Sequence, residues 1–90
     1  MIVKTLNPTA YNGTFETQSA TGRFNADGAR HLTHCSGTVR DGETVLGQFN
    51  AWKEESFQYD FNGISDLTKL PVVAAAAQEA VEGITAELAQ

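Results

Sequence analysis

The apolar residues of four consecutive segments fall mainly on odd-numbered positions, and this regularity limits the folds open to the chain more than any other feature. Successive side chains of a strand point to opposite faces, so such a pattern predicts strands with one buried face. Two Asp-Gly turns and a Lys-Glu-Glu turn separate the segments. We therefore expect an antiparallel meander with strands over residues 14–24, 30–39, 43–52 and 56–62.

The pairing register follows from the two Asp-Gly turns. If each is a type I turn followed by a glycine bulge, Gly28 and Gly42 take the left-handed conformation that glycine adopts without strain. Val39 is then opposite Glu43, and Cys35 lies between Ser19 and Gly47. A tighter two-residue loop would scatter the apolar set over both faces. The bulged register gathers Phe15, Cys35, Val39, Val45, Phe49, Ala51, Phe57, Tyr59 and Phe61 on one face.

An alanine-rich segment over residues 66–89 is predicted to form a single C-terminal helix. Ser65 and Asp66 can cap its start, and Pro71 is tolerated in a first turn. Its apolar residues recur at helical spacing and predict a buried stripe of Val73, Ala77, Ala80, Val81, Ile84 and Leu88.

The predicted fold is therefore one α+β domain over residues 1–90. It consists of an N-terminal segment (1–13), a four-stranded meander (14–62) and the helix (66–89), which packs on one face of the sheet. The N-terminal segment adds a fifth, edge strand if residues 2–6 pair with the sheet.

Charge and hydropathy exclude several kinds of partner. The 90 residues hold 11 acidic and 6 basic side chains, a net charge of −5, and the basic residues are scattered singly. Direct nucleic-acid binding needs a clustered positive surface, which this pattern does not predict. No apolar run approaches the ~20 residues of a membrane span, and residues 1–10 do not resemble a secretory signal. We expect a cytoplasmic protein without membrane contact, whose charged partners are basic.

The segment His31-Leu32-Thr33-His34-Cys35 is the one cluster of reactive residue types. On a strand, His34 points away from His31 and Cys35, so the three side chains do not converge on a metal ion. We expect Cys35 to be a buried thiol. We expect no cofactor. Residues 37–42 have the glycine spacing of a phosphate-binding loop, but Glu43 stands where that loop needs lysine.

The even-numbered face is the predicted partner-binding surface. The register places Phe24, Arg30 and Trp52 in one row with Leu32 adjacent, which is the composition of an interface hot spot. Acidic side chains that a basic partner would contact are Glu54 and Glu55 beside the last turn, and Glu79 and Glu82 on the helix.

These observations predict a non-enzymatic, acidic protein-binding module. Small inhibitors carried by phages and mobile elements share its size, charge and lack of a catalytic signature, so an inhibitor or adaptor of a basic or nucleic-acid-associated protein complex is the expected role. One alternative is a structural subunit that forms a homodimer through a sheet edge. A second alternative is a small enzyme that uses His31 with Cys35, or His34 with Asp60.

Overall fold

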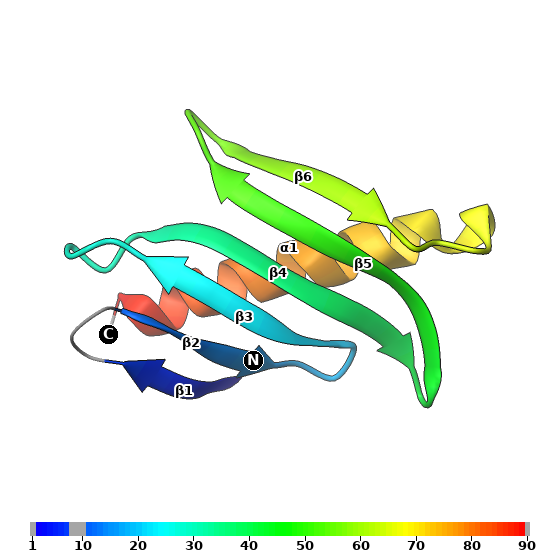
Figure 1. Ribbon diagram of the computed structural model, residues 1–90, viewed down its shortest axis with the longest axis horizontal. Helices are drawn as coiled ribbons and strands as arrows, with labels where there is room; N and C mark the ends of the chain where they lie inside the picture. Colours follow the sequence, from blue (N-terminus) through cyan, green and yellow to red (C-terminus); the bar gives the residue numbers. More distant parts are fainter. Residues whose placement is uncertain (1, 8–10, 90) are drawn as a thin grey trace.

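The computed structural model describes residues 2–7 and 11–89 as a two-layer α+β fold (Figure 1). Antiparallel strands lie side by side in sequence order in one sheet, and a C-terminal helix crosses one face of it. The predicted class, a meander covered on one face by a C-terminal helix, is confirmed. The described elements are β1 (Ile2–Asn7), β2 (Asn12–Glu16), β3 (Ala20–Ala26), β4 (Leu32–Asp41), β5 (Thr44–Lys53), β6 (Phe57–Asn62), the 3₁₀ turn η1 (Leu67–Lys69) and α1 (Leu70–Leu88).

The sheet has six strands within the described ranges, rather than the four or five predicted. The segment predicted as one strand over residues 14–24 is two strands, β2 and β3, joined by a turn at Thr17. The Thr17 hydroxyl accepts hydrogen bonds from the Ser19 and Ala20 amides at 3.1 and 2.9 Å, and the Thr17 amide donates to the Ala20 carbonyl at 2.8 Å. Hydroxyl side chains stabilise such turns without any glycine or proline.

Pairing within the sheet differs from the predicted register, although most of the odd-numbered face of β4 to β6 survives. Val39 is opposite Gly47 rather than Glu43, a shift of four residues along β5, and Cys35 is opposite Ala51. The turn accounts for most of the shift, because Asp41 pairs with Thr44 around a two-residue Gly42-Glu43 loop instead of the predicted bulged turn, and a bulge beside Val39 adds the last residue. Because the net shift is even, Cys35, Val39, Phe49 and Ala51 stay on the helix-facing side as predicted. The bulge reverses the face of Val45, which pairs with Arg40 and is 44% exposed, so its predicted burial is wrong.

Two other predicted pairings are also wrong. In the last hairpin, Phe49 is opposite Phe61 and Ala51 opposite Tyr59, again an even shift. On the other side of β4, Cys35 is opposite Phe24 instead of Ser19, because Ser19 lies in the turn that joins β2 to β3.

The core lies between the sheet and α1. The helical stripe is confirmed, with Val73, Ala77, Ala80, Val81, Ile84 and Leu88 all buried, together with Ala76. Small residues let the layers approach. A Cβ atom at Gly47 would lie 2.6 Å from Ile64 Cγ1 and 3.4 Å from Val73 Cγ2. Phe15 and Phe49, whose ring centroids are 6.5 Å apart, pack over Gly37 from the two sides.

The start of the helical region is capped as predicted. The Asp66 carboxylate accepts hydrogen bonds from the Thr68 hydroxyl at 2.6 Å and the Thr68 amide at 3.0 Å, and Pro71 lies in the first turn of α1. These two bonds, with the hydroxyl the larger cause, lower the pKa of Asp66 because they stabilise the charged form.

Replacing Asp66 with alanine is expected to lower the melting temperature at neutral pH, since the cap is lost. A lowered pKa means that the stabilisation is present above the ordinary carboxyl pKa and disappears as the pH falls through the lowered value. The difference between wild type and Asp66→Ala should therefore shrink in strong acid. Thermal melts at pH 7 and at decreasing pH measure this, and a constant difference would contradict the capping role.

Candidate functional site

The open face, which we define as the sheet surface turned away from α1, carries a single large aromatic side chain on β4 to β6. Trp52 is 36% exposed and is paired with His34 of β4 and Gln58 of β6. β1 extends the sheet beside β2 and does not cross this face in the part that the structure describes. Trp52 is therefore accessible, in agreement with its predicted place on the even-numbered face.

Phe24 and Leu32 do not share that surface, and their prediction as exposed neighbours of Trp52 is wrong. Phe24 is 1% exposed and Leu32 is 4% exposed, both within the core under α1. Phe24 faces the helix because it pairs with Cys35, which lies on the helix-facing side of β4. Leu32 does so because the β3–β4 pairing is irregular at Thr33, where Ala26 pairs with Leu32 and Asn25 with His34.

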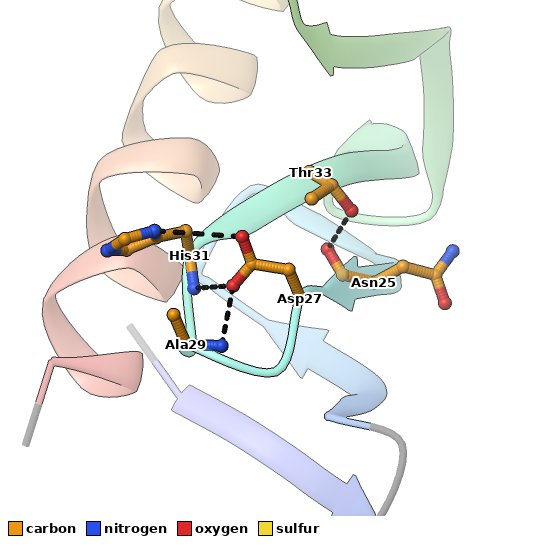
Figure 2. Close-up of polar contacts among 5 residues, drawn as sticks. All are labelled: Asn25, Asp27, Ala29, His31 and Thr33. Carbon is orange, nitrogen blue, oxygen red and sulfur yellow. Dashed lines mark hydrogen bonds and ion pairs between the residues drawn. The ribbon is translucent and has the colours of Figure 1, made fainter.

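Arg30 lies in the β3–β4 loop rather than on a strand row, with φ of +65°. Asp27 organises this loop (Figure 2): its Oδ1 accepts hydrogen bonds from the Ala29 and His31 amides, both at 2.9 Å, and its Oδ2 lies 3.6 Å from Nδ1 of His31. The His31 amide is the largest cause that lowers the pKa of Asp27. Gly28 does not take the left-handed position that the sequence predicted; Arg30 does.

A pocket of about 760 Å³ opens beside this loop, and we call it the end pocket. It lies between the β3–β4 loop, the β5–β6 hairpin and the last turn of α1. Its polar lining includes Arg30, His31 and Lys53. Its apolar lining includes Leu32, Phe57 and Leu88.

A second hollow, which we call the edge groove, follows the outer strand β6. It has a volume of about 480 Å³, and its apolar walls include Tyr59, Phe61, Leu67 and Leu70. The Tyr59 and Phe61 rings are stacked, with centroids 6.1 Å apart. Leu67 is 76% exposed and Leu70 39% exposed. Sequence reasoning missed this groove, because it forms only where the start of the helical region passes the sheet edge (Figure 1).

The four predicted acidic candidates are all exposed. Glu54 and Glu55 lie in the β5–β6 turn, at the start of β6, and Glu79 and Glu82 lie on α1. Glu82 is close enough to Tyr59 that its charge, second to burial, raises the pKa of that phenol. Glu54, Glu55 and Glu82 therefore lie around β6, whereas Trp52 lies on the open face.

The fold does not bring the residues of the predicted enzymatic alternatives into a catalytic arrangement. Cys35 is fully buried, and desolvation raises the pKa of its thiol from 9.0 to about 12, so it stays protonated at neutral pH and is not a thiolate nucleophile. His34 pairs with Trp52, while Asp60 pairs with Asn50 in the next outward-facing row. Residues 2–7 and 11–89 contain no group of three or more His, Cys, Asp and Glu side chains placed to hold a metal ion.

Within the same ranges, no helix has the length and hydropathy to cross a lipid bilayer. Comparison with protein-family models, curated proteins and solved structures gives no significant match. The candidate binding surfaces are therefore the edge groove, the open face and the end pocket.

Proposed function

We propose that this chain is a non-enzymatic protein-binding module of the cytoplasm that captures an extended, basic segment of a partner protein along β6. The observation that carries the proposal is the edge groove: an outer strand bordered by stacked aromatic rings and exposed leucines. Such a module would act as an inhibitor or adaptor, by blocking the captured segment or bridging it to another component.

β6 has the properties of a strand that accepts another strand. It is the last strand of the sheet, it contains neither proline nor lysine, and its pairing with β5 has no bulge. Proteins usually protect a sheet edge with such devices or with a covering element. Of the six strands, β6 has the least contact with α1. An extended peptide can therefore hydrogen-bond to the free side of β6 and place alternate side chains in the groove.

The acidic residues around β6 favour a partner segment with basic side chains. Glu54 and Glu55 lie at one end of the strand, Asp66 lies beyond the other end, and Glu82 is close to Tyr59. With a net charge of −5, this surface favours a segment that alternates apolar and basic side chains, and the attraction weakens as salt is added.

The same charges disfavour the alternative of a homodimer through β6. Two copies paired antiparallel about a two-fold axis would bring the same acidic strand against itself, because each patch contacts its own copy in such a dimer. Like charges opposite each other in a sheet are destabilising. We expect light scattering to show a monomer over a wide concentration range, and a dimer that is lost in edge-groove variants would instead favour self-association.

The double variant Leu67→Ser/Leu70→Ser is expected to weaken partner capture at least tenfold, because hot-spot side chains each contribute about 1–2 kcal/mol. Both leucines are exposed, so the fold should be retained. Affinity capture from lysate of the source organism, with mass spectrometry of what is retained, identifies the partner; titration with that partner measures the loss.

Two further variants make this test specific. Val45→Ser removes a side chain that is 44% exposed at the far hairpin and should leave capture unchanged. Trp52→Ala tests the open face. In the wild-type complex, slowed hydrogen exchange of the β6 amides would support strand addition. Loss of capture in Trp52→Ala but not in the double leucine variant would overturn the edge groove as the site and assign binding to the open face.

A further inference from the structure

We propose that the end pocket binds a small organic monocarboxylate with an apolar body, whose carboxylate is held by Arg30 and Lys53. This site is separate from the edge groove and would give the module a small-molecule ligand in addition to a protein partner. Four independent features of the pocket support it: its charge, an orphaned donor, a strained backbone and an apolar wall.

The pocket concentrates positive charge in a chain that is otherwise acidic. Arg30 and Lys53, two of the six basic residues, line it together with His31. Neither Arg30 nor Lys53 forms an ion pair with a carboxylate in the part of the chain that the structure describes. Asp27 also lines the pocket, and its negative charge offsets one of the two cations, so the lining stays net positive. Its carboxylate accepts hydrogen bonds from the Ala29 and His31 amides.

The guanidinium of Arg30 contains an unsatisfied donor. Its Nε is buried and has no hydrogen-bond partner among the described residues. Leaving such a buried donor unpaired is costly, and most buried polar atoms in native proteins have a partner. A carboxylate is the natural acceptor, because its two oxygens match the fork of a guanidinium.

The backbone conformation of Arg30 also supports a binding site. A φ of +65° is a conformation in which glycine, asparagine or aspartate is much less strained than arginine. Strained backbone of this kind concentrates at functional sites. Gly28, two residues earlier, does not take a left-handed conformation, so the loop places the strain on the side chain that lines the pocket.

The walls of the pocket supply the apolar half of the site. Leu32, Phe57 and Leu88 come from three different elements, and the Lys53 ammonium lies 5.4 Å from the centroid of the Phe57 ring. A volume of about 760 Å³ is in the ordinary range for small-ligand sites, which combine apolar walls with a few polar groups. An aliphatic or aromatic body can therefore lie on these walls while its carboxylate reaches Arg30.

A purely structural role for the cations is the competing explanation. α1 has no basic residue in its last turn, and cations near a helix C-terminus offset its dipole. That role needs no buried side-chain donor, however, and the Nε of Arg30 donates to no carbonyl of the helix end. The net charge of −5 favours a monoanion over a more highly charged ligand.

Titration of the ¹⁵N-labelled protein with octanoate at pH 7 tests the proposal. We expect saturable shifts confined to the β3–β4 loop, the β5–β6 hairpin and the end of α1. Arg30→Gly should weaken octanoate at least tenfold while the melting temperature stays equal or rises, because glycine relieves the positive φ. Lys53→Gln should also weaken binding and serves as the second variant if Arg30→Gly does not fold.

Two matched controls decide the interpretation. Arg40→Gln removes the same charge at the other end of β4 and should leave the affinity unchanged. Octylammonium has the same apolar chain with the opposite charge and should not bind. Absence of saturable binding, equal binding of octylammonium, or an equal loss in Arg40→Gln and Lys53→Gln would each overturn the proposal. So would an Arg30→Gly protein that melts lower and binds octanoate as the wild type does.

Discussion

Replacing Phe24 with alanine is expected to lower the free energy of unfolding by about 3–5 kcal/mol, the usual loss for a buried phenylalanine. Phe24 is 1% exposed and pairs across the sheet with Cys35, in the middle of the core. A domain of this length is stable by only about 5–13 kcal/mol, so the variant should be partly unfolded at physiological temperature. Urea denaturation followed by circular dichroism measures the loss.

Trp52→Ala is the informative comparison, because sequence reasoning placed both aromatic residues in one exposed row. Trp52 is 36% exposed on the open face, so its removal should cost about 1–2 kcal/mol, well below the loss for Phe24. Equal losses in the two variants would mean that the open face is covered in solution. A small loss in Phe24→Ala would mean that β3 presents its other face to the helix.

The parts of the fold that sequence reasoning predicted are those set by local periodicity. The stripe from Val73 to Leu88 has a spacing that only a helix produces, and Asp66 followed by Thr68 marks its start. Most of the odd-numbered face of β4 to β6 was also predictable, because errors of two or four residues in register do not change the face of a side chain. Val45 is an exception, because the bulge beside Val39 reverses its face.

The rule that odd-numbered residues are buried failed where a single turn or bulge reversed the alternation of side chains. The turn at Thr17 is stabilised by the Thr17 hydroxyl, whose hydrogen bonds to the backbone compete with strand pairing. In a Thr-rich segment, the sequence does not distinguish this threonine from an ordinary strand residue. Because of this turn, odd-numbered Phe15 of β2 and even-numbered Phe24 of β3 lie on the same buried face. An irregular pairing at Thr33 has the same effect on Leu32. The bulge beside Val39 is a third such feature, because it moves Val45 to the open face.

The candidate sites were harder to predict because they join residues far apart in the sequence. The edge groove combines Phe61 with Leu70, and the end pocket combines Arg30 with Lys53 and Leu88. Pairings of this kind depend on where α1 crosses the sheet, which no periodicity specifies. Of the residues predicted to bind a partner, Arg30 lies in the end pocket and Trp52 on the open face, so one predicted patch corresponds to two separate surfaces.

Wild type and Cys35→Ala are expected to exchange their order of stability in alkaline solution. At pH 7 the variant should be less stable by about 1 kcal/mol, the effect of removing a small buried apolar group. Burial raises the pKa of the Cys35 thiol from 9.0 to about 12, so above pH 9 the unfolded chain loses a proton that the folded chain retains. A raised pKa of this kind stabilises the fold below the unfolded-state value and loses that effect as the pH rises.

The slope of this loss is about 1.4 kcal/mol per pH unit for one thiol, so the two stability curves should cross near pH 10. Tyrosine and lysine ionisation affects both proteins alike, which is why the difference between them is the quantity to measure. Urea denaturation at pH 7, 9, 10 and 10.5 gives that difference. A constant gap from pH 7 to 10.5 would contradict the buried, protonated thiol, and so would rapid reaction of native Cys35 with a disulfide reagent at pH 8, since a thiol held under α1 reacts only when the core opens.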